Sequence, residues 1–232
     1  MLDQAFDALK TYDWGTDPNV LRPIDNAIVA TQADAAARKE LEKRLAAVLG
    51  TAVSRDAKDS VCRRLMIVGT AESVPALAAL LPEKDHSHMA RFALERIPAP
   101  EAAAALRDAL PKVSPELKIG VIASLGSRKD AASVEALGAL LTGADAAVAA
   151  AAASALGDIR TAEAGQVLAA AKPESAGTKL AVTNASLACA EGLLAHGKKA
   201  EALAIYKGVA SQELPKHMKL AATRGMLACA GK

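Results

Sequence analysis

The feature that most constrains the fold of this sequence is a repeat in its middle part. Four segments align with one another without gaps. The first column of the alignment holds Leu77, Leu106, Leu137 and Leu168, whose spacings are 29, 31 and 31 residues. The second column lies twelve positions earlier and holds Leu65, Leu94, Leu125 and Leu156. A period of this length indicates stacked units of two short elements, because one such unit cannot bury its apolar face alone.

Each repeat has the pattern of two helices joined by a short turn. Helix A carries the second leucine column, and the position three residues later also faces the predicted core. Val68, Ile97, Arg128 and Ile159 occupy that position. Helix B carries the first leucine column, and its apolar residues recur at helical spacing, as at Val74, Leu77, Leu80 and Leu81.

Glycines mark where helix A is expected to end. Gly126 and Gly157 directly follow the helix A leucine, and we expect the chain to leave the helix there in a left-handed conformation. In the first repeat Gly69 lies three positions later in the register and is expected to end its helix at that point. The turn between the two helices is therefore predicted from the sequence itself.

Composition supports an all-α fold. Hydrophobic residues make up 52% of the sequence, and nearly half of them are alanine, whereas aromatic residues make up only 2%. Alanine favours helices, and β-branched residues, which favour strands, are sparse. A chain of 232 residues is long enough to bury a core without disulfides. We therefore predict an α-solenoid of stacked antiparallel helix pairs.

The repeat is less regular before residue 59. The segment 34–53 predicts a long amphipathic helix, and the segment 20–31 predicts a shorter one with Pro23 near its start. We interpret residues 1–58 as an N-terminal helical cap. Trp14 is the only tryptophan of the sequence, and we expect its side chain to seal the exposed end of the stack.

The rhythm changes again after residue 172. The segment 179–190 recurs at 219–230 with eight identities in twelve positions and an offset of 40. Between the copies, Ala202 and Tyr206 fall on one helical face, and Pro215 follows the helix end. We interpret 59–172 as the regular repeats and 173–232 as a longer repeat that stops half-way through a unit, and we expect a fragment of a larger multidomain protein.

The segments SALGDIRTAEAGQVL and RRLMIVGTAESVPALAALL, each with a polar turn before a leucine-rich helix B, resemble HEAT repeats, particularly the short bacterial HEAT-like class. The resemblance covers residues 59–172, and the C-terminal third is similar to tetratricopeptide repeats. The resemblance implies a right-handed superhelix whose B helices line a concave face. It also implies a scaffold or protein-binding role and no particular substrate.

The sequence contains no constellation typical of an enzyme. It has no glycine-rich phosphate-binding motif, and no serine stands in the strand–turn–helix context of a nucleophile. The cysteines lack metal-ligand spacing, and we expect buried free thiols at Cys62, Cys189 and Cys229. We predict no catalytic residues, no cofactor and a protein that is not an enzyme.

Acidic pairs are interpreted in the same way. Glu40 with Glu42, and Asp56 with Asp59, alternate with lysines and arginines, which is typical of a solvated helix face rather than of a catalytic dyad.

The segment Asp85–His88 is the sharpest local candidate for a metal site, since two histidines and an aspartate lie within four residues. It also lies where one repeat ends and the next helix A begins. Asp85 or Ser87 is suited to cap that helix, with His86 and His88 exposed beside it. A metal site would need a further ligand from elsewhere, so we predict no metal site.

The alternative function is a HEAT-like nucleic-acid-binding protein or an enzyme of the alkylpurine DNA glycosylase type. Such glycosylases present tryptophans around a catalytic aspartate on a strongly basic surface. This sequence has one tryptophan near its N-terminus, and its net charge is +2 from 28 basic and 26 acidic residues. Phycobilin lyases also use HEAT-like repeats, and no constellation suited to a tetrapyrrole stands out here. We therefore expect no nucleic-acid partner.

The expected partner is a protein, a peptide or an attached domain of the same chain. If the B helices line a groove, positions next to the leucine column supply its polar groups, and arginines are typical anchors of protein interfaces. The candidate partner-binding residues are Arg91, Arg107, Asp108, Glu135 and Gln166.

Membrane insertion and targeting are also not predicted. The apolar run 144–156 is too short to cross a bilayer, and the first residues carry acids where a signal peptide would be basic. We expect a soluble protein, with the cytoplasm favoured.

Overall fold

The computed structural model describes residues 1–231, and over this range the chain is helical with no strand. It divides into two compact units, residues 1–117 and 118–232. The three sequence segments 1–58, 59–172 and 173–232 remain a prediction.

Unit 1 contains α1 Leu2–Ala8, the 3-10 helix η1 Pro18–Leu21, α2 Arg22–Ala30, α3 Ala35–Leu49, α4 Arg55–Val68, α5 Val74–Ala78, α6 Ser87–Arg96 and α7 Pro100–Ala109. Helix α8, Pro115–Ser127, begins at the end of unit 1. Unit 2 continues with η2 Ala131–Ser133, α9 Val134–Leu140, α10 Ala146–Ile159, α11 Ala162–Ala170, α12 Ala176–Ala195, α13 Lys199–Ala210 and α14 Lys216–Cys229.

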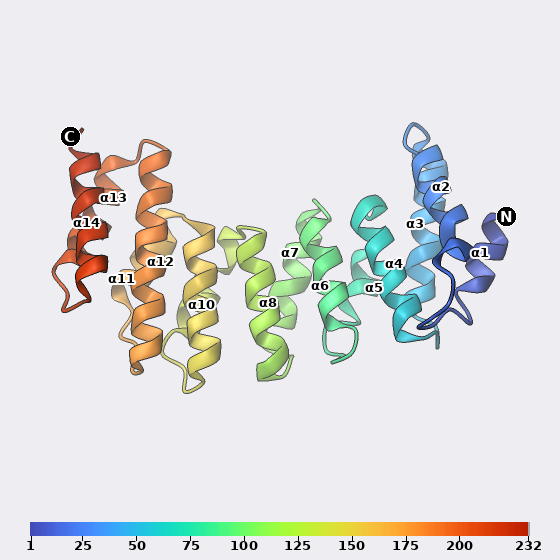
Figure 1. Ribbon diagram of the computed structural model, residues 1–232, viewed down its shortest axis with the longest axis horizontal. Helices are drawn as coiled ribbons and strands as arrows, with labels where there is room; N and C mark the ends of the chain where they lie inside the picture. Colours follow the sequence, from blue (N-terminus) through green and yellow to red (C-terminus); the bar gives the residue numbers. More distant parts are fainter. Residues whose placement is uncertain (232) are drawn as a thin grey trace. The chain divides into compact units, whose positions relative to one another are not determined.

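The predicted helix pairs are confirmed. Helices α4, α6, α8 and α10 are the A helices of the repeats, and α5, α7, α9 and α11 are the B helices. In the C-terminal segment α12 and α14 continue the row of A helices, and α13 continues the row of B helices. Within unit 1, α4 packs on α6 and α5 on α7, and within unit 2, α10 packs on α12 and α9 on α11 (Figure 1). Each unit is therefore a stack of helix pairs, the arrangement of an α-solenoid.

The leucine columns form the core that the alignment predicts. All eight column leucines have an exposed fraction of 1% or less. The position three residues after the helix A leucine is also buried at Val68, Ile97 and Ile159, whereas Arg128 is only half-buried. Helix α5 ends at Ala78, so Leu80 and Leu81 lie beyond the helix, yet both remain buried.

The prediction for Gly126 and Gly157 is wrong. Both lie within the last turn of their helices, α8 and α10, and neither has a left-handed conformation. A Cβ atom at Gly126 would lie 2.9 Å from the Cα of Ala155, and one at Gly157 would lie 2.9 Å from the Cα of Ala185. These glycines therefore let the backbones of neighbouring A helices touch. The left-handed positions fall later, at Lys129 with φ 53° and Arg160 with φ 57°.

The N-terminal helices agree with the sequence, and Trp14 does not. Helix α3 lies within the predicted segment 34–53, and α2 contains Pro23 in its first turn. The Trp14 side chain is 91% exposed, so the expectation that it seals the stack is wrong. The loop that carries it is closed by its own hydrogen bonds and does not fold the indole back onto α1 or α2.

The C-terminal segment is built as its repeat indicates. The two copies form α12 and α14, and α13 between them buries Ala202 and Tyr206 on one face. Pro215 is the N-cap of α14. A Cβ atom at Gly225 would collide with the ring of Tyr206, so this glycine makes room for the one buried tyrosine ring of the segment.

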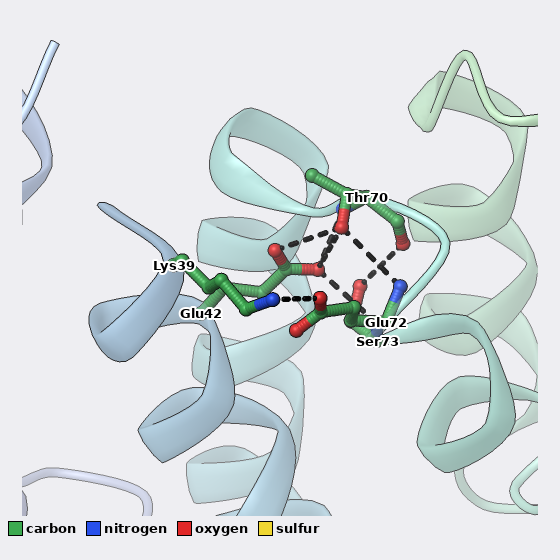
Figure 2. Close-up of polar contacts among 5 residues, drawn as sticks. All are labelled: Lys39, Glu42, Thr70, Glu72 and Ser73. Carbon is green, nitrogen blue, oxygen red and sulfur yellow. Dashed lines mark hydrogen bonds and ion pairs between the residues drawn. The ribbon is translucent and has the colours of Figure 1, made fainter. Parts of the chain in front are cut away.

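A buried carboxylate joins α3 to the turn between α4 and α5 (Figure 2). Glu42 is only 2% exposed, so its interpretation as part of a solvated face is wrong. Its Oε1 atom accepts the backbone N–H of Thr70 at 2.6 Å and that of Ser73 at 3.1 Å, and both carboxylate oxygens accept the Thr70 hydroxyl at 3.0 Å. Ser73 is the N-cap of α5, and its hydroxyl donates to the Thr70 carbonyl rather than to the helix. Glu42 therefore acts as the cap that α5 does not supply itself.

Candidate interaction surface

Shallow open grooves separate successive B helices within each unit. Alanines and glycines make up much of their lining. In unit 1 a groove of about 400 Å³ lies between α5 and α7. In unit 2 a groove of about 710 Å³ lies between α9 and α11, and one of about 330 Å³ lies between α11 and α13.

The unit 1 groove has an apolar floor and a charged rim. Its floor includes Val74, Pro75 and several alanines of α7. Glu101, in the first turn of α7, stands at one end, while Asp108 and Lys112 stand at the other. An apolar surface with charged groups at both ends suits a chain segment better than an enclosed small molecule.

The larger groove of unit 2 repeats this pattern. Glu135 and Glu163 lie in the first turns of α9 and α11, and Lys172 follows the end of α11. The backbone N–H of Glu163 and the Thr161 hydroxyl hold the pKa of the Glu163 carboxyl below its usual value. This carboxylate is therefore charged at neutral pH, where it also complements the positive end of the α11 dipole.

The α11–α13 groove is narrower and reaches down to an A helix. Its walls contain Gly165, Ala169, Ala204 and Gly208, and its floor includes Ser186 and Leu193 of α12. Gln166, Glu201 and Gln212 supply the polar rim. This is the most enclosed of the grooves described here, and it has side-chain amides in place of most of the charges.

The structure distributes the predicted partner-binding residues rather than gathering them. Asp108, Glu135 and Gln166 each line a different groove. Arg107 lies on α7 half-buried and outside the α5–α7 groove lining, and Arg91 lies half-buried on the A helix α6. Burial is the main cause that lowers the pKa of the Arg91 guanidinium.

Sequence reasoning missed the glutamates at the start of the B helices. They lie five positions before the leucine of helix B, where the register places Glu72, Glu101 and Glu163, with Ala132 in the remaining repeat. This column of acids could have indicated the rims of the grooves, because an acidic residue in the first turn both stabilises a helix and remains exposed.

The segment Asp85–His88 is arranged differently from the prediction. His86 is the N-cap of α6, and neither Asp85 nor Ser87 donates or accepts a capping side-chain hydrogen bond there. The Nδ1 atom of His86 lies 2.8 Å from Glu83, and His88 stacks on Phe92 with ring centroids 5.9 Å apart. Within residues 1–231, no group of three or more His, Cys, Asp or Glu side chains is placed to hold a metal ion.

The predicted buried thiols and two aromatic side chains, Tyr206 and Phe92, differ in exposure. Cys62 and Cys189 are buried as predicted, and Cys229 is half-buried. Tyr206 belongs to the core, whereas Phe92 is 39% exposed.

In the described part of the chain, no helix is both long and apolar enough to cross a membrane.

The fold and these grooves define a helical repeat protein, and comparison with known proteins names the repeat. Residues 103–185 match the family model of HEAT repeats. This part of the chain is therefore similar to HEAT repeats, as the resemblance of its sequence implied, and the match extends beyond residue 172 into the C-terminal segment. A search of the curated proteins found no match.

Solved structures also resemble this chain. One is human deoxyhypusine hydroxylase in complex with glycerol, which is 15% identical, with a TM-score of 0.39. The alignment covers 100% of this chain and 96% of that one. This finding corrects the prediction that the chain is not an enzyme, because a protein that aligns with it over its full length is an enzyme. At this TM-score the likeness carries no argument about any reaction, and we assign none.

Proposed function

We propose that this chain is a HEAT-repeat scaffold whose B-helix grooves bind a segment of a partner protein. The observation that carries the proposal is the recurrence of an open groove with an apolar floor and a polar rim between B helices in both units. Asp108, Glu135 and Gln166 are the residues of the rims that would contact the partner. The attached domain of a longer chain is one form such a partner can take.

The groove chemistry limits what can bind. Alanines and glycines form the walls, so the grooves accept apolar side chains that project from the partner, while the rim groups pair with polar groups of its backbone or side chains. An extended segment or a short helix meets both requirements. Most of the binding energy is then expected from a few apolar side chains of the partner seated between the helices.

The test uses a substitution that fills a groove without disturbing the fold. Gly208 lines the α11–α13 groove, and a Cβ atom there meets nothing within 4 Å. We expect Gly208→Leu to fill the groove and to leave the helix intact. Gly208→Ala is the matched control, because it changes the same backbone position and leaves most of the groove open.

Partner contact is measured by photo-crosslinking in a lysate of the native host. A crosslinker placed at Gln166 should capture a defined protein, and the same crosslinker at the exposed Asn184 of α12 should not. Gly208→Leu should abolish the capture and Gly208→Ala should preserve it. Capture that is equal at both positions, or that survives Gly208→Leu, contradicts the proposal.

A further inference from the structure

Trp14 is exposed on a loop that is held in a fixed conformation. The loop connects α1 to η1, and its backbone is tied by hydrogen bonds from the Trp14 N–H to Asp13 Oδ1 at 2.9 Å and from the Asp13 N–H to the Thr16 hydroxyl at 3.1 Å. Gly15 takes a left-handed conformation with φ 85°. An indole that is 91% exposed gives up the free energy of burying a large apolar group, so this loop presents its aromatic ring to solvent at a cost.

The loop is anchored to the start of α4. The Ser54 hydroxyl donates a hydrogen bond to the Tyr12 carbonyl, and the same oxygen accepts the N–H of Ala57 at 3.0 Å as the N-cap of α4. One side chain thus begins the helix and fixes the loop. The backbone of the loop is thereby fixed at the start of α4, with Tyr12 half-buried and Trp14 exposed.

A cavity of about 370 Å³ lies between the loop and α4. The residues that define its chemistry are two aromatic rings, three carboxylates and one guanidinium, namely Tyr12, Trp14, Asp13, Asp56, Asp59 and Arg63. The charged side chains of the lining sum to −2, whereas the whole sequence carries +2. The charged groups of the lining are therefore net negative by themselves, while Arg55, outside the lining, also acts on Asp59.

One carboxylate of the lining lacks a donor. The Oδ1 atom of Asp59 is buried and has no hydrogen-bond partner within the described chain. Burial raises the pKa of the Asp59 carboxyl, while Arg55 and Arg63 act in the opposite direction. A carboxylate oxygen removed from water without a donor is unfavourable, and a positive charge bound beside this carboxylate would lower that cost through space.

We propose that this cavity, here called the Trp14 site, binds an organic cation with an ammonium or guanidinium group at the end of an alkyl chain. The positive group pairs with Asp56 and Asp59, and the indole and phenol rings attract it and pack on its alkyl stem. Two sources share this chemistry: the lysine or arginine side chain of a partner protein and a free alkylamine or alkylguanidine. The site is separate from the B-helix grooves, and the proposal does not depend on them.

The sequence provides a specific readout, because its single tryptophan gives one indole N–H peak in a ¹H–¹⁵N NMR spectrum. The intact protein is titrated with n-butylammonium, with n-butylguanidinium and with neutral n-butanol as the isosteric control. We expect both cations to shift the indole peak with saturation and n-butanol to leave it unchanged. An equal shift with n-butanol, or no shift with either cation, overturns the proposal.

Substitutions that remove a negative or a positive charge from the lining test the site further. Asp59→Asn and Asp56→Asn remove attraction and should each weaken binding, by roughly fivefold, whereas Arg63→Gln removes a competing cation and should tighten it. Glu40→Gln is the control, because it removes an exposed acid of unit 1 that is outside the lining. Unchanged affinity in Asp59→Asn and Asp56→Asn, or an equal loss in Glu40→Gln, shows that the cations respond only to the general charge of the protein and contradicts the site.

A final experiment distinguishes a protein side chain from a free small molecule as the source of the cation. Trp14→Ala, followed through the amide peak of Gly15, should lose most of the binding, and the exposure of Trp14 makes this variant safe for the fold. A pentapeptide with one central lysine flanked by glycines is compared with n-butylammonium. Tighter binding of the peptide assigns the site to a protein side chain, and tighter binding of the amine assigns it to a small molecule. Retention of full affinity in Trp14→Ala contradicts the proposal.

Discussion

Glu42 shows how one carboxylate can hold a turn that belongs to another helix pair. It reaches from α3 to the backbone N–H groups of Thr70 and Ser73, and Lys39, one turn earlier on the same helix, forms an ion pair with Glu72 at 2.5 Å. The Lys39–Glu72 pair is exposed and contributes little to stability. The Glu42 hydrogen bonds are buried and charge-assisted, so they carry most of the connection.

We therefore expect Glu42→Ala to be strongly destabilising. The substitution removes charge-assisted hydrogen bonds from the backbone N–H groups of Thr70 and Ser73, each worth about 1.5–3 kcal/mol, and it also removes buried methylene groups. The Ser73 N–H keeps only the Thr70 carbonyl, at 3.3 Å. Glu40→Ala on the exposed side of α3 should change the free energy of unfolding by less than about 0.5 kcal/mol. Urea denaturation of the two variants measures the difference, and equal stabilities would rule out the role of Glu42 as a cap.

Asp59 gives a pH-dependent prediction. Because burial raises its pKa in the folded state above the ordinary value of an aspartate, the folded protein holds this proton more tightly than the unfolded chain does. The free energy of unfolding then falls as the pH rises through the folded pKa, and at neutral pH the ionised carboxylate is a cost. Asp59→Asn should be more stable than the original protein at about pH 7, with an advantage that shrinks toward about pH 4. Thermal unfolding at a series of pH values measures this, and an advantage that grows on acidification has the wrong sign.

At the scale of the element, the A helices are governed by how closely their backbones approach. Gly126 and Gly157 occur at the same position of the repeat, one residue after the buried leucine, and each faces an alanine of the next A helix. Contact between backbones brings the leucine columns together with little space between them. The same glycines lower the helix propensity of their own segments by about 1 kcal/mol relative to alanine, so packing offsets a local cost.

Two glycine substitutions of the same chemistry should thus have opposite effects. Gly157→Ala places a methyl group against the Ala185 backbone and should destabilise the protein by about 1–3 kcal/mol. Gly208→Ala enters open space on α13 and should stabilise it by about 0.5–1 kcal/mol. Circular dichroism during thermal unfolding compares the two variants. Stabilisation by both would mean that the α10–α12 contact is looser than the structure shows.

The sequence predicts much of this architecture, because periodic leucines report which face of each helix is buried. The sequence does not show how closely neighbouring helices approach one another. A glycine directly after the helix A leucine can continue the helix or leave it in a left-handed conformation. The sequence does not distinguish these two cases, so Gly157 was misinterpreted. Glu42 lies on the apolar stripe next to Leu41 and Leu45, yet its charge suggested solvent, because its partners are backbone atoms distant in sequence. Trp14 was misplaced because loop geometry, not apolarity, determines where its ring lies.

The grooves were predictable as a surface but not as separate sites. The register places Asp108, Glu135 and Gln166 close to the helix B leucine, and each indeed lines a groove. Which neighbours share that groove depends on the spacing of the helices, which the sequence does not show. The Trp14 site was inaccessible to the sequence, because Ser54 joins two segments that no pattern relates.

At the scale of the whole molecule, the chain has two units, and each contains one deeply buried thiol. Cys62 lies in unit 1 and Cys189 in unit 2, while the half-buried Cys229 lies near the end of α14. Burial raises the pKa of the Cys62 thiol to about 12 and that of the Cys189 thiol to about 11. Since the thiolate is the reactive form, both thiols are protected as long as their units are folded.

We therefore expect a disulfide reagent to modify Cys229 rapidly in the native protein and Cys62 and Cys189 only after opening of their units. Pulse labelling at increasing urea concentrations, read by mass spectrometry of peptides, follows the two units separately. Labelling of Cys62 and Cys189 at different midpoints means that the units unfold independently, and a shared midpoint means one cooperative transition. Rapid modification of Cys62 or Cys189 without denaturant contradicts their burial.

The contact between Tyr206 and Gly225 has an evolutionary consequence. The tyrosine ring occupies the place that a side chain at position 225 would need, whereas the preceding copy of the repeat has Ala185 at that position. A change at 225 to any larger residue is harmful while the tyrosine is present and becomes acceptable once a smaller residue replaces it. The two positions are thus coupled, and the order of substitution is constrained, because the ring at position 206 has to become smaller before position 225 can take a larger residue.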